Sequence, residues 1–348
     1  MNSVALVNNK GGPGKAMLTF HLAHMLQRMG RRVLAVDLDP QASLTAAFLD
    51  EDDLRIFWDQ PQNAAGQEPK PSLPDMPHGT VASAIRPVVD GTGDIASFYP
   101  VRVADGLWLV PGDLGLCAYE ERLAQAWPRA LTGTDLAAVE VTSAFHRLIG
   151  YAAKSVDADL VLIDVGPNLG AINRAALLAA DTVLTPLAPD LFSLRGLDQL
   201  GPALSQWRSA WRESVLPKAP VSSPVPHGLM APLGYVVMQP ENRSSKRLRA
   251  TQRWLDQVPV TYATAVLGQE SYDPSGRSFE IAALRDYQNL MPMAQDSRKP
   301  MFDLLPADGA LGSIRAYVQK CREDFESLAE KVLSRLDEVD QPGGAAGE

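Results

Sequence analysis

Residues 8–17 read Asn8-Asn9-Lys10-Gly11-Gly12-Pro13-Gly14-Lys15-Ala16-Met17, and this stretch indicates the fold class of the chain. An apolar run from Val4 to Val7 precedes it, and a helical pattern with one apolar face follows it. A strand, a glycine-rich turn and a helix start form a cradle for a phosphate group, because glycines let successive backbone N–H groups converge on one anion. The helix N-terminus adds a partial positive charge and Lys15 adds a full one. The stretch therefore predicts a phosphate-binding loop, with an ordinary glycine-rich turn as the alternative.

Two departures from the common nucleotide-loop pattern narrow this interpretation. That pattern has Gly where Asn9 stands and Ser or Thr where Ala16 stands. The order Lys10-Gly11-Gly12-x-Gly14-Lys15 resembles the deviant Walker A motif of the ParA/MinD family of P-loop ATPases. The resemblance implies that Lys10 reaches across an ATP-sandwich homodimer to the partner's phosphates and that Lys10 and Lys15 act in catalysis. It also implies nucleotide contacts along the loop, from Gly11, Gly12, Pro13, Gly14, Lys15, Ala16 and Met17.

A pair of acidic residues follows the second predicted strand, 32–36. The sequence there is Asp37-Leu38-Asp39-Pro40-Gln41, and ligands of parallel sheets bind at the carboxyl ends of the strands. Acids two positions apart on a strand point to the same face, so both can attend one metal or water. The family resemblance extends to this Asp-x-Asp-Pro-Gln segment and implies that Asp39 orients the attacking water while Asp37 supports a Mg²⁺ shell. A polar turn at a strand end is the alternative.

A third motif is the fully apolar run Leu160 to Ile163, which ends in Asp164. A run of this kind is typical of a strand covered on both faces. The terminal Asp164 fits the Walker B role of holding Mg²⁺ through water. Gly166-Pro167 follows, where the family more often has two prolines.

The remaining pattern alternates apolar strands with amphipathic helices, which predicts a doubly wound, mostly parallel sheet with helices on both faces, of the P-loop NTPase type. Further strands are expected at 107–110, 182–185 and 233–238, and helices at about 15–29, 135–153, 173–180 and within 303–337. We expect one domain over 1–337, flexible excursions near 59–80 and 217–232, and a disordered acidic tail at 338–348. The resemblance spans roughly 1–335, and it places a loop at 186–196 and adenine contacts at Gln239 and Pro240.

The amino-acid composition limits the classes of protein to which the chain can belong. The chain has 348 residues, a formal net charge of −9 and two cysteines, Cys117 and Cys321, without metal-ligand spacing. Both cysteines are expected to be buried, and His21, His24 and Arg28 to lie on the solvent side of the first helix. The sequence contains no apolar run near the ~20 residues of a membrane span and starts directly as a strand, so we expect a bacterial-type cytoplasmic protein without a membrane partner.

One local stretch is strongly basic within this acidic chain. Lys246, Arg249 and Arg253 share a helical face, and Arg243 and Arg247 lie beside them. ParA-like proteins bind DNA without sequence preference as ATP dimers, so the stripe is a candidate DNA-binding surface and the chain would then associate with the nucleoid. A solvated helix face that pairs with nearby acids is the alternative.

The absence of a hydroxyl at Ala16 affects the expected activity. In P-loop enzymes the residue after the motif lysine gives its hydroxyl to Mg²⁺, and Met17 likewise replaces a family threonine. Water can fill a vacant Mg²⁺ position, whereas hydrolysis requires tighter positioning of the γ-phosphate. We expect the chain to bind ATP or ADP and to hydrolyse ATP slowly.

Two classes of function remain open. The first is a partition or positioning ATPase, whose ATP dimer holds DNA until an unidentified activating or cargo protein triggers release. The second is a nucleotide-gated scaffold or regulatory subunit with little ATPase activity or DNA binding. The family's iron–sulfur branch requires bridging cysteines that this chain lacks, and its membrane-anchored branch requires a basic C-terminal amphipathic helix, whereas the polar face within 303–337 carries both signs.

Overall fold

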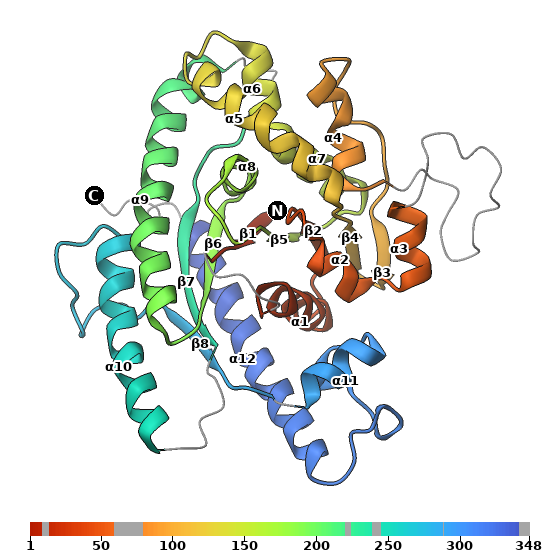
Figure 1. Ribbon diagram of the computed structural model, residues 1–348, viewed down its shortest axis with the longest axis vertical. Coiled ribbons are helices and arrows are strands. Elements are labelled where there is room, and N and C mark those ends of the chain that lie inside the picture. Colours follow the sequence, from red (N-terminus) through yellow and green to blue (C-terminus); the bar gives the residue numbers. More distant parts are fainter. Residues whose placement is uncertain (9–13, 59–78, 220–223, 239–244, 288, 341–348) are drawn as a thin grey trace.

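The computed structural model describes residues 1–8, 14–58, 79–219, 224–238, 245–287 and 289–340, without the side chains of 245–251 and 340. Its eight strands form one sheet in the order β3-β4-β2-β5-β1-β6-β7-β8 (Figure 1). The strands are β1 (Asn2–Leu6), β2 (Val33–Asp37), β3 (Val101–Ala104), β4 (Leu107–Val110), β5 (Leu160–Asp164), β6 (Thr182–Leu187), β7 (Ala231–Met238) and β8 (Glu280–Leu284). Only the β3–β4 pairing is antiparallel among them. The predicted doubly wound, mostly parallel sheet is confirmed.

Helices cover both faces of this sheet, and each face has its own apolar core. One layer contains α1 (Gly14–Arg28), α2 (Ser43–Phe48), α11 (Leu290–Ser297) and α12 (Ser313–Asp340). The other contains α4 (Val81–Asp90), α5 (Tyr119–Ala130), α6 (Leu136–Thr142), α7 (Ala144–Ser155), α8 (Ala171–Leu178) and α9 (Leu191–Ser214). α3 (Glu51–Trp58) lies beside α2, and α10 (Ser245–Thr261) packs along α9 (Figure 1). The central strands β2, β5 and β6 are buried along their whole length because both of their faces are covered, and most of their residues are apolar.

Several element boundaries differ from the sequence-based expectation. The helix expected at 135–153 is two helices, α6 and α7, that meet at Ser143. The expected loop 186–196 contains the end of β6 and the start of α9, whose N-cap Asp190 accepts a hydrogen bond from the Ser193 amide. The C-terminal helix begins at Ser313, after two short 3₁₀ turns, and continues to Asp340 beyond the predicted start of the tail. The predicted excursion at 59–80, apart from its last two residues, and 341–348 lie outside the described residues. Of the excursion predicted at 217–232 only 220–223 lie outside, and its last two residues belong to β7, which begins at Ala231.

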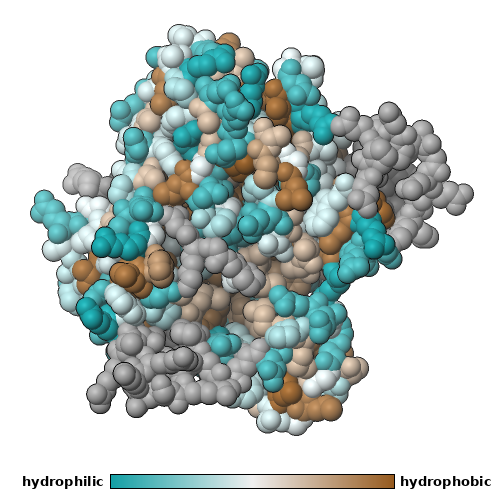
Figure 2. All heavy atoms as spheres, viewed as in Figure 1, coloured by the Kyte–Doolittle hydropathy of each residue, from teal (hydrophilic) through white to brown (hydrophobic). Residues whose placement is uncertain are grey.

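The face of the molecule seen in Figure 2 is mostly hydrophilic where it is coloured. Figure 2 shows one face in teal and pale tones, with separate hydrophobic patches. None of the described helices is both long and apolar enough to cross a bilayer. Cys321 is buried as expected, but Cys117 is exposed, because it lies on the short 3₁₀ turn Leu114–Ala118 at the surface.

The expectation that His21 faces solvent is wrong. Its side chain is fully buried because α12 and the 3₁₀ turn Met301–Asp303 cover that side of α1. The imidazole Nδ1 lies 2.6 Å from the Met17 carbonyl oxygen, and Nε2 accepts a hydrogen bond of 3.0 Å from the Met301 amide. His24, beside it, is partly buried. Of the three residues expected on the solvent side, only Arg28 is exposed, and its guanidinium pairs with Asp303. His21 therefore ties the phosphate-loop helix to the C-terminal layer.

The burial of His21 predicts a specific acid sensitivity. Burial lowers the pKa of His21 to about 4, against 6.5 in an unfolded chain. Between these values the unfolded state binds more protons, so the free energy of unfolding falls as the pH drops from 6.5 towards 4, by up to about 1.4 kcal/mol per pH unit. Chemical denaturation at stepped pH should give a shallower acid limb for His21→Gln than for the wild type. The same substitution at exposed His227 should leave the slope unchanged, and equal slopes for all three proteins would contradict this account.

Candidate nucleotide and magnesium site

The sequence motifs converge at one edge of the sheet, where β1, β2 and β5 end. β5 lies between β1 and β2, and its last residue, Asp164, is in register with Leu6 on one side and Asp37 on the other. α1 begins at Gly14 above this edge, so that Lys15 is in its first turn. The arrangement follows from the topology, because parallel strands bring their carboxyl ends to the same edge and the connecting helix starts there.

Lys15 is the centre of this site. Its Nζ donates to Asp164 Oδ1 at 2.9 Å and lies 3.9 Å from Asp39 Oδ2. All three side chains are buried, with Lys15 and Asp39 each 5% exposed. Thr19, one turn further along α1, brings its hydroxyl to within 3.4 Å of Asp164 Oδ1 and donates to the Lys15 carbonyl. The predicted lysine and two of the predicted acids therefore occupy one buried cluster.

Asp164 has one oxygen without a partner. Oδ2 is buried and makes no hydrogen bond among the described residues. Burial raises the pKa of Asp164, against the opposing effect of Lys15. A buried carboxylate oxygen without a donor is the ligand type that Mg²⁺ or its water shell requires. The donor set thus fits the magnesium role predicted for Asp164.

Asp37 is engaged differently from Asp164. Its Oδ2 accepts hydrogen bonds from the Thr45 amide at 2.8 Å and the Thr45 hydroxyl at 2.7 Å, and its Oδ1 accepts one from the Asp39 amide at 3.2 Å. Burial, and secondly the neighbouring Asp164, raises the pKa of Asp37 to about 7. Gly112 supports the arrangement, because a Cβ at that position would lie 2.8 Å from the Asp37 carbonyl oxygen. These contacts fix the turn that carries Asp39.

Ala16 and Met17 are buried in the first turn of α1, and neither side chain has a hydroxyl to offer the site. Six of the predicted nucleotide-site residues lie outside the described residues: Lys10, Gly11, Gly12, Pro13, Gln239 and Pro240. Of the predicted basic stripe, Arg243 and the side chains of Lys246, Arg247 and Arg249 also lie outside it. Arg253 is exposed, and its guanidinium carbon lies 5.5 Å from the centre of the Trp254 ring.

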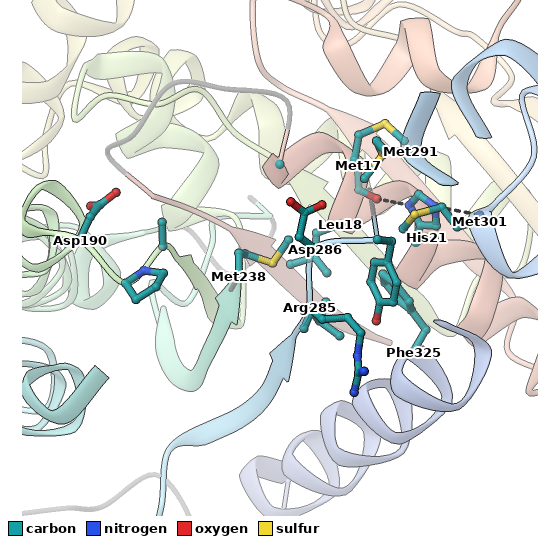
Figure 3. A pocket seen from close by; sticks show the side chains of 15 residues that line it. Met17, Leu18, His21, Asp190, Met238, Arg285, Asp286, Met291, Met301 and Phe325 are labelled. Carbon is teal, nitrogen blue, oxygen red and sulfur yellow. Dashed lines mark hydrogen bonds between the residues drawn. The ribbon is translucent and has the colours of Figure 1, made fainter. Parts of the chain in front are cut away.

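A cavity of about 360 Å³ adjoins the first turns of α1. Figure 3 shows Met238, Leu18 and Asp286 close together in its middle, Asp190 at one end, and His21 with Met301 at the other. Its walls come from the ends of β7 and β8, from α11 and from α12, and are largely apolar. The sequence predicted nucleotide contacts at Gly14 and Met17, on the α1 side of this cavity, and at the residues that follow Met238 on its β7 side. The lining residues after position 280 belong to no sequence motif. Met238, in contrast, directly precedes the predicted adenine contacts.

Two further polar atoms in this region were not predicted from the sequence. Asn8 Oδ1 and Thr185 Oγ1 are buried without a hydrogen-bond partner among the described residues, while Asn8 Nδ2 donates to the Pro186 carbonyl at 3.2 Å. Both residues stand at or near the ends of strands that flank the loop. Asn8 was part of the motif, but only the tertiary structure shows that its side chain points to β6.

Known relatives match the N-terminal part of the chain. A family model described as an AAA domain matches residues 1–215. A Rhizobium rhizogenes protein, named provisionally as replication protein A, is 33% identical over 198 residues, which cover 56% of this chain and 42% of the relative. A Thermus thermophilus protein named as a probable plasmid-partitioning protein ParA is 30% identical over 213 residues, 61% of this chain and 52% of the relative. The chain thus spans about half the length of these relatives.

Solved structures resemble nearly the whole chain. Protein DIP2308 from Corynebacterium diphtheriae superposes with a TM-score of 0.63 at 22% identity, covering 97% of this chain and 99% of that one. The McdA protein of Cyanothece in complex with ATP gives a TM-score of 0.56 at 18% identity, with coverage of 97% and 96%. At these identities the similarity establishes the fold. Together with the match over 1–215 and the strand-end site, it means that the chain belongs to the ParA/MinD family of P-loop ATPases.

Proposed function

We propose that this chain is a ParA-like, ATP-dependent dimer switch that binds DNA nonspecifically in its ATP state and thereby partitions or positions DNA or another cargo. The observation that carries the proposal is the buried cluster of Lys15, Asp164 and Asp39 beneath the N-terminus of α1. A cation that is already held by two carboxylates can turn to an incoming phosphate, and the freed carboxylates can then serve Mg²⁺ and water. This exchange is what a P-loop site requires.

Each site residue then has a distinct role. Lys15 and the backbone around Gly14, Ala16 and Met17 would hold the phosphates, and Asp164 would hold the magnesium shell through its free Oδ2. Bound Mg²⁺ supplies charge neutralisation on the phosphates. Asp39, whose Oδ1 is fixed by the Gln41 amide at 3.0 Å, would orient the attacking water. Asp37 would support the Mg²⁺ shell indirectly, mainly by fixing the turn that carries Asp39.

The cavity beside α1 is the candidate base site. The apolar contacts that a purine base needs come from Met17, Leu18, Met238 and Leu284. Asp286 adds a carboxylate close to Leu18 and Met238 (Figure 3). Gln239 and Pro240, which directly follow Met238, remain candidate base contacts. We expect ATP and ADP to share this site.

The proposed dimer has support from exposed apolar residues. Leu191 is 47% and Phe192 75% exposed in the first turn of α9, next to Asp190 at the end of the base cavity. Large apolar side chains exposed beside a ligand site are typical of an interface. Lys10 would reach the second subunit's nucleotide, and Arg253 with Lys246, Arg249 and Arg243 would supply the DNA contacts.

Light scattering after gel filtration tests the switch. The expected result is a monomer without nucleotide and with ADP, and a dimer with Mg²⁺ and ATP. Lys10→Ala should bind ATP but remain a monomer, and the same substitution at exposed Lys154 should change nothing. An unchanged mass under all nucleotide conditions would contradict the proposal.

DNA binding distinguishes the dimer switch from a second candidate function. That candidate is a nucleotide-gated scaffold with little ATPase activity, and the buried Ala16, which has no hydroxyl, favours it. Fluorescence anisotropy with a random-sequence duplex should show binding that needs ATP and weakens steeply with salt. Replacing Lys246 and Arg249 by glutamine should reduce both the affinity and the salt slope. If ATP-bound dimers ignore DNA even at low salt, the scaffold is the better description.

Ala16 should limit the rate of hydrolysis more than nucleotide binding. Ala16→Thr restores a hydroxyl at the Mg²⁺ position, so we expect phosphate release to rise by about tenfold or more, with a smaller change in ATP affinity. Ala16→Val has the same shape without the hydroxyl and should not increase turnover. Equal rates for the Thr and Val variants would mean that the hydroxyl is not what limits the reaction.

A further inference from the structure

A second cavity, of about 410 Å³, lies away from the nucleotide site at the start of β8. The π-helical turn Tyr262–Val266 after α10 and the exposed segment 268–280 enclose it, beside α9 (Figure 1). β8 joins the two regions, because Glu280 at its start lines this cavity and Leu284 at its end lines the base cavity. Among the described residues, none of those assigned to the nucleotide site lines this cavity.

The wall of this cavity is aromatic. Tyr235 and Tyr262 have ring centres 5.0 Å apart, and Phe279 lies 5.8 Å from Tyr262. Tyr272, which is 38% exposed, completes the lining at the surface. The Tyr262 hydroxyl is buried and has no hydrogen-bond partner among the described residues, and burial raises the pKa of this phenol. The hydroxyl oxygen itself is shielded, so Tyr262 offers the cavity its ring and not its hydroxyl.

The charge lining the cavity is negative once its ion pairs are counted. Arg277, 5.1 Å from the centre of the Phe279 ring, shares the Glu338 carboxylate of α12 with Arg335, so two guanidiniums are set against three carboxylates, those of Glu338, Asp273 and Glu280. Asp273 and Glu280 pair with no cationic side chain among the described residues. Two hydrogen bonds from Ser275 to Asp273 Oδ1, at 2.7 and 2.9 Å, lower the pKa of Asp273 and keep it ionised.

These aromatic faces already attract cations. Arg335 of α12 lies 5.7 Å from the centre of Phe279, on the same ring that Arg277 contacts. Rings of Tyr and Phe bind ammonium and guanidinium groups through their quadrupoles, and a nearby carboxylate adds charge pairing. A phosphate or carboxylate ligand would meet two unpaired acids and one arginine that is already occupied.

We propose that this cavity binds a small aliphatic cation, a primary ammonium or guanidinium group, between Tyr235, Tyr272, Asp273 and Glu280. The proposal is independent of the ATPase switch. The ammonium would lie against the tyrosine rings and donate to the carboxylates, and the cavity has room for the aliphatic chain behind it.

Titration calorimetry with putrescine, agmatine and the uncharged isostere 1,4-butanediol tests this. Putrescine and agmatine should bind saturably at one site, and the diol should not bind. N-acetyl-lysine amide distinguishes the source of the cation: tighter binding of this compound than of putrescine indicates a partner's side chain, and the reverse indicates a free amine.

Substitutions of the lining residues test whether the ligand binds in this cavity. Asp273→Asn combined with Glu280→Gln should weaken putrescine binding at least tenfold, whereas Glu270→Gln, which removes one negative charge from the same segment outside the lining, should leave it unchanged. Tyr272→Ala should weaken binding about fivefold and Tyr272→Phe should retain it. Binding of the diol equal to that of putrescine, binding of inorganic phosphate in its place, or affinities that ignore the Asp273 and Glu280 changes would overturn the proposal.

Discussion

Replacing Lys15 by methionine is expected to weaken ATP binding about a hundredfold or more and also to destabilise the nucleotide-free protein. The first effect follows because Lys15 is the charged group at the phosphate cradle, and removal of one member of a desolvated charge pair typically costs about 2–5 kcal/mol. The second follows from the ligand-free contacts, because Lys15 Nζ donates to the fully buried Asp164 at 2.9 Å. Loss of one partner of a buried ion pair destabilises a protein by about 3–5 kcal/mol.

A double variant separates the two effects. Burial already raises the pKa of Asp164, so without Lys15 this carboxyl should take up a proton and the loss of stability should be smaller at low pH. Lys15→Met combined with Asp164→Asn should recover much of the stability while ATP binding stays as weak as in Lys15→Met. Lys154→Met, a change at an exposed lysine of α7, is the control for charge alone. If the double variant is no more stable than Lys15→Met, Lys15 and Asp164 are not an energetic pair.

The second large effect is expected at Gly201 in α9. A Cβ there would lie 1.9 Å from the Ala265 carbonyl oxygen and 2.8 Å from the Val266 Cα, so the π-helical turn that follows α10 would have to move. Backbone atoms cannot rotate away as a side chain can, and we expect Gly201→Ala to reduce the free energy of unfolding by about 3 kcal/mol.

Gly150 in α7 is the matched control for this substitution. No atom lies within 4 Å of a Cβ built at Gly150, so Gly150→Ala should stabilise the protein by about 0.5–1 kcal/mol through helix propensity. Urea denaturation of both variants measures the difference. A Gly201→Ala variant as stable as Gly150→Ala would show that α9 and the turn at 262–266 do not pack as closely as described.

The sequence predicted those parts of the site that depend on local pattern. Lys15 follows a glycine-rich turn at a helix start, and Asp37 and Asp164 each end an apolar strand; strand topology alone then brings them together. Gly30 follows the last apolar residue of the first helix and is left-handed, with φ 84°, as is typical of a glycine after a helix C-terminus.

Contacts between distant segments could not be predicted in this way. His21 has the spacing of a polar residue on an amphipathic helix, and its burial depends on Met301, 280 residues later in the chain. Thr45 lies within an unremarkable small-residue segment, yet its amide and hydroxyl both bind Asp37. The aromatic cavity combines β7, the turn after α10 and a turn-rich segment, 268–279, that carries no apolar periodicity. Each of these features arises from tertiary packing, which no local pattern encodes.

The account rests on adenine nucleotide binding at the N-terminus of α1, and calorimetric titration of the wild-type protein with ATP in the presence of Mg²⁺ measures this directly. We predict one ATP per chain with an affinity in the micromolar range, weakened when Mg²⁺ is removed and weakened about a hundredfold or more in Lys15→Met. Absence of binding at millimolar ATP, or binding of equal strength by Lys15→Met, would contradict it.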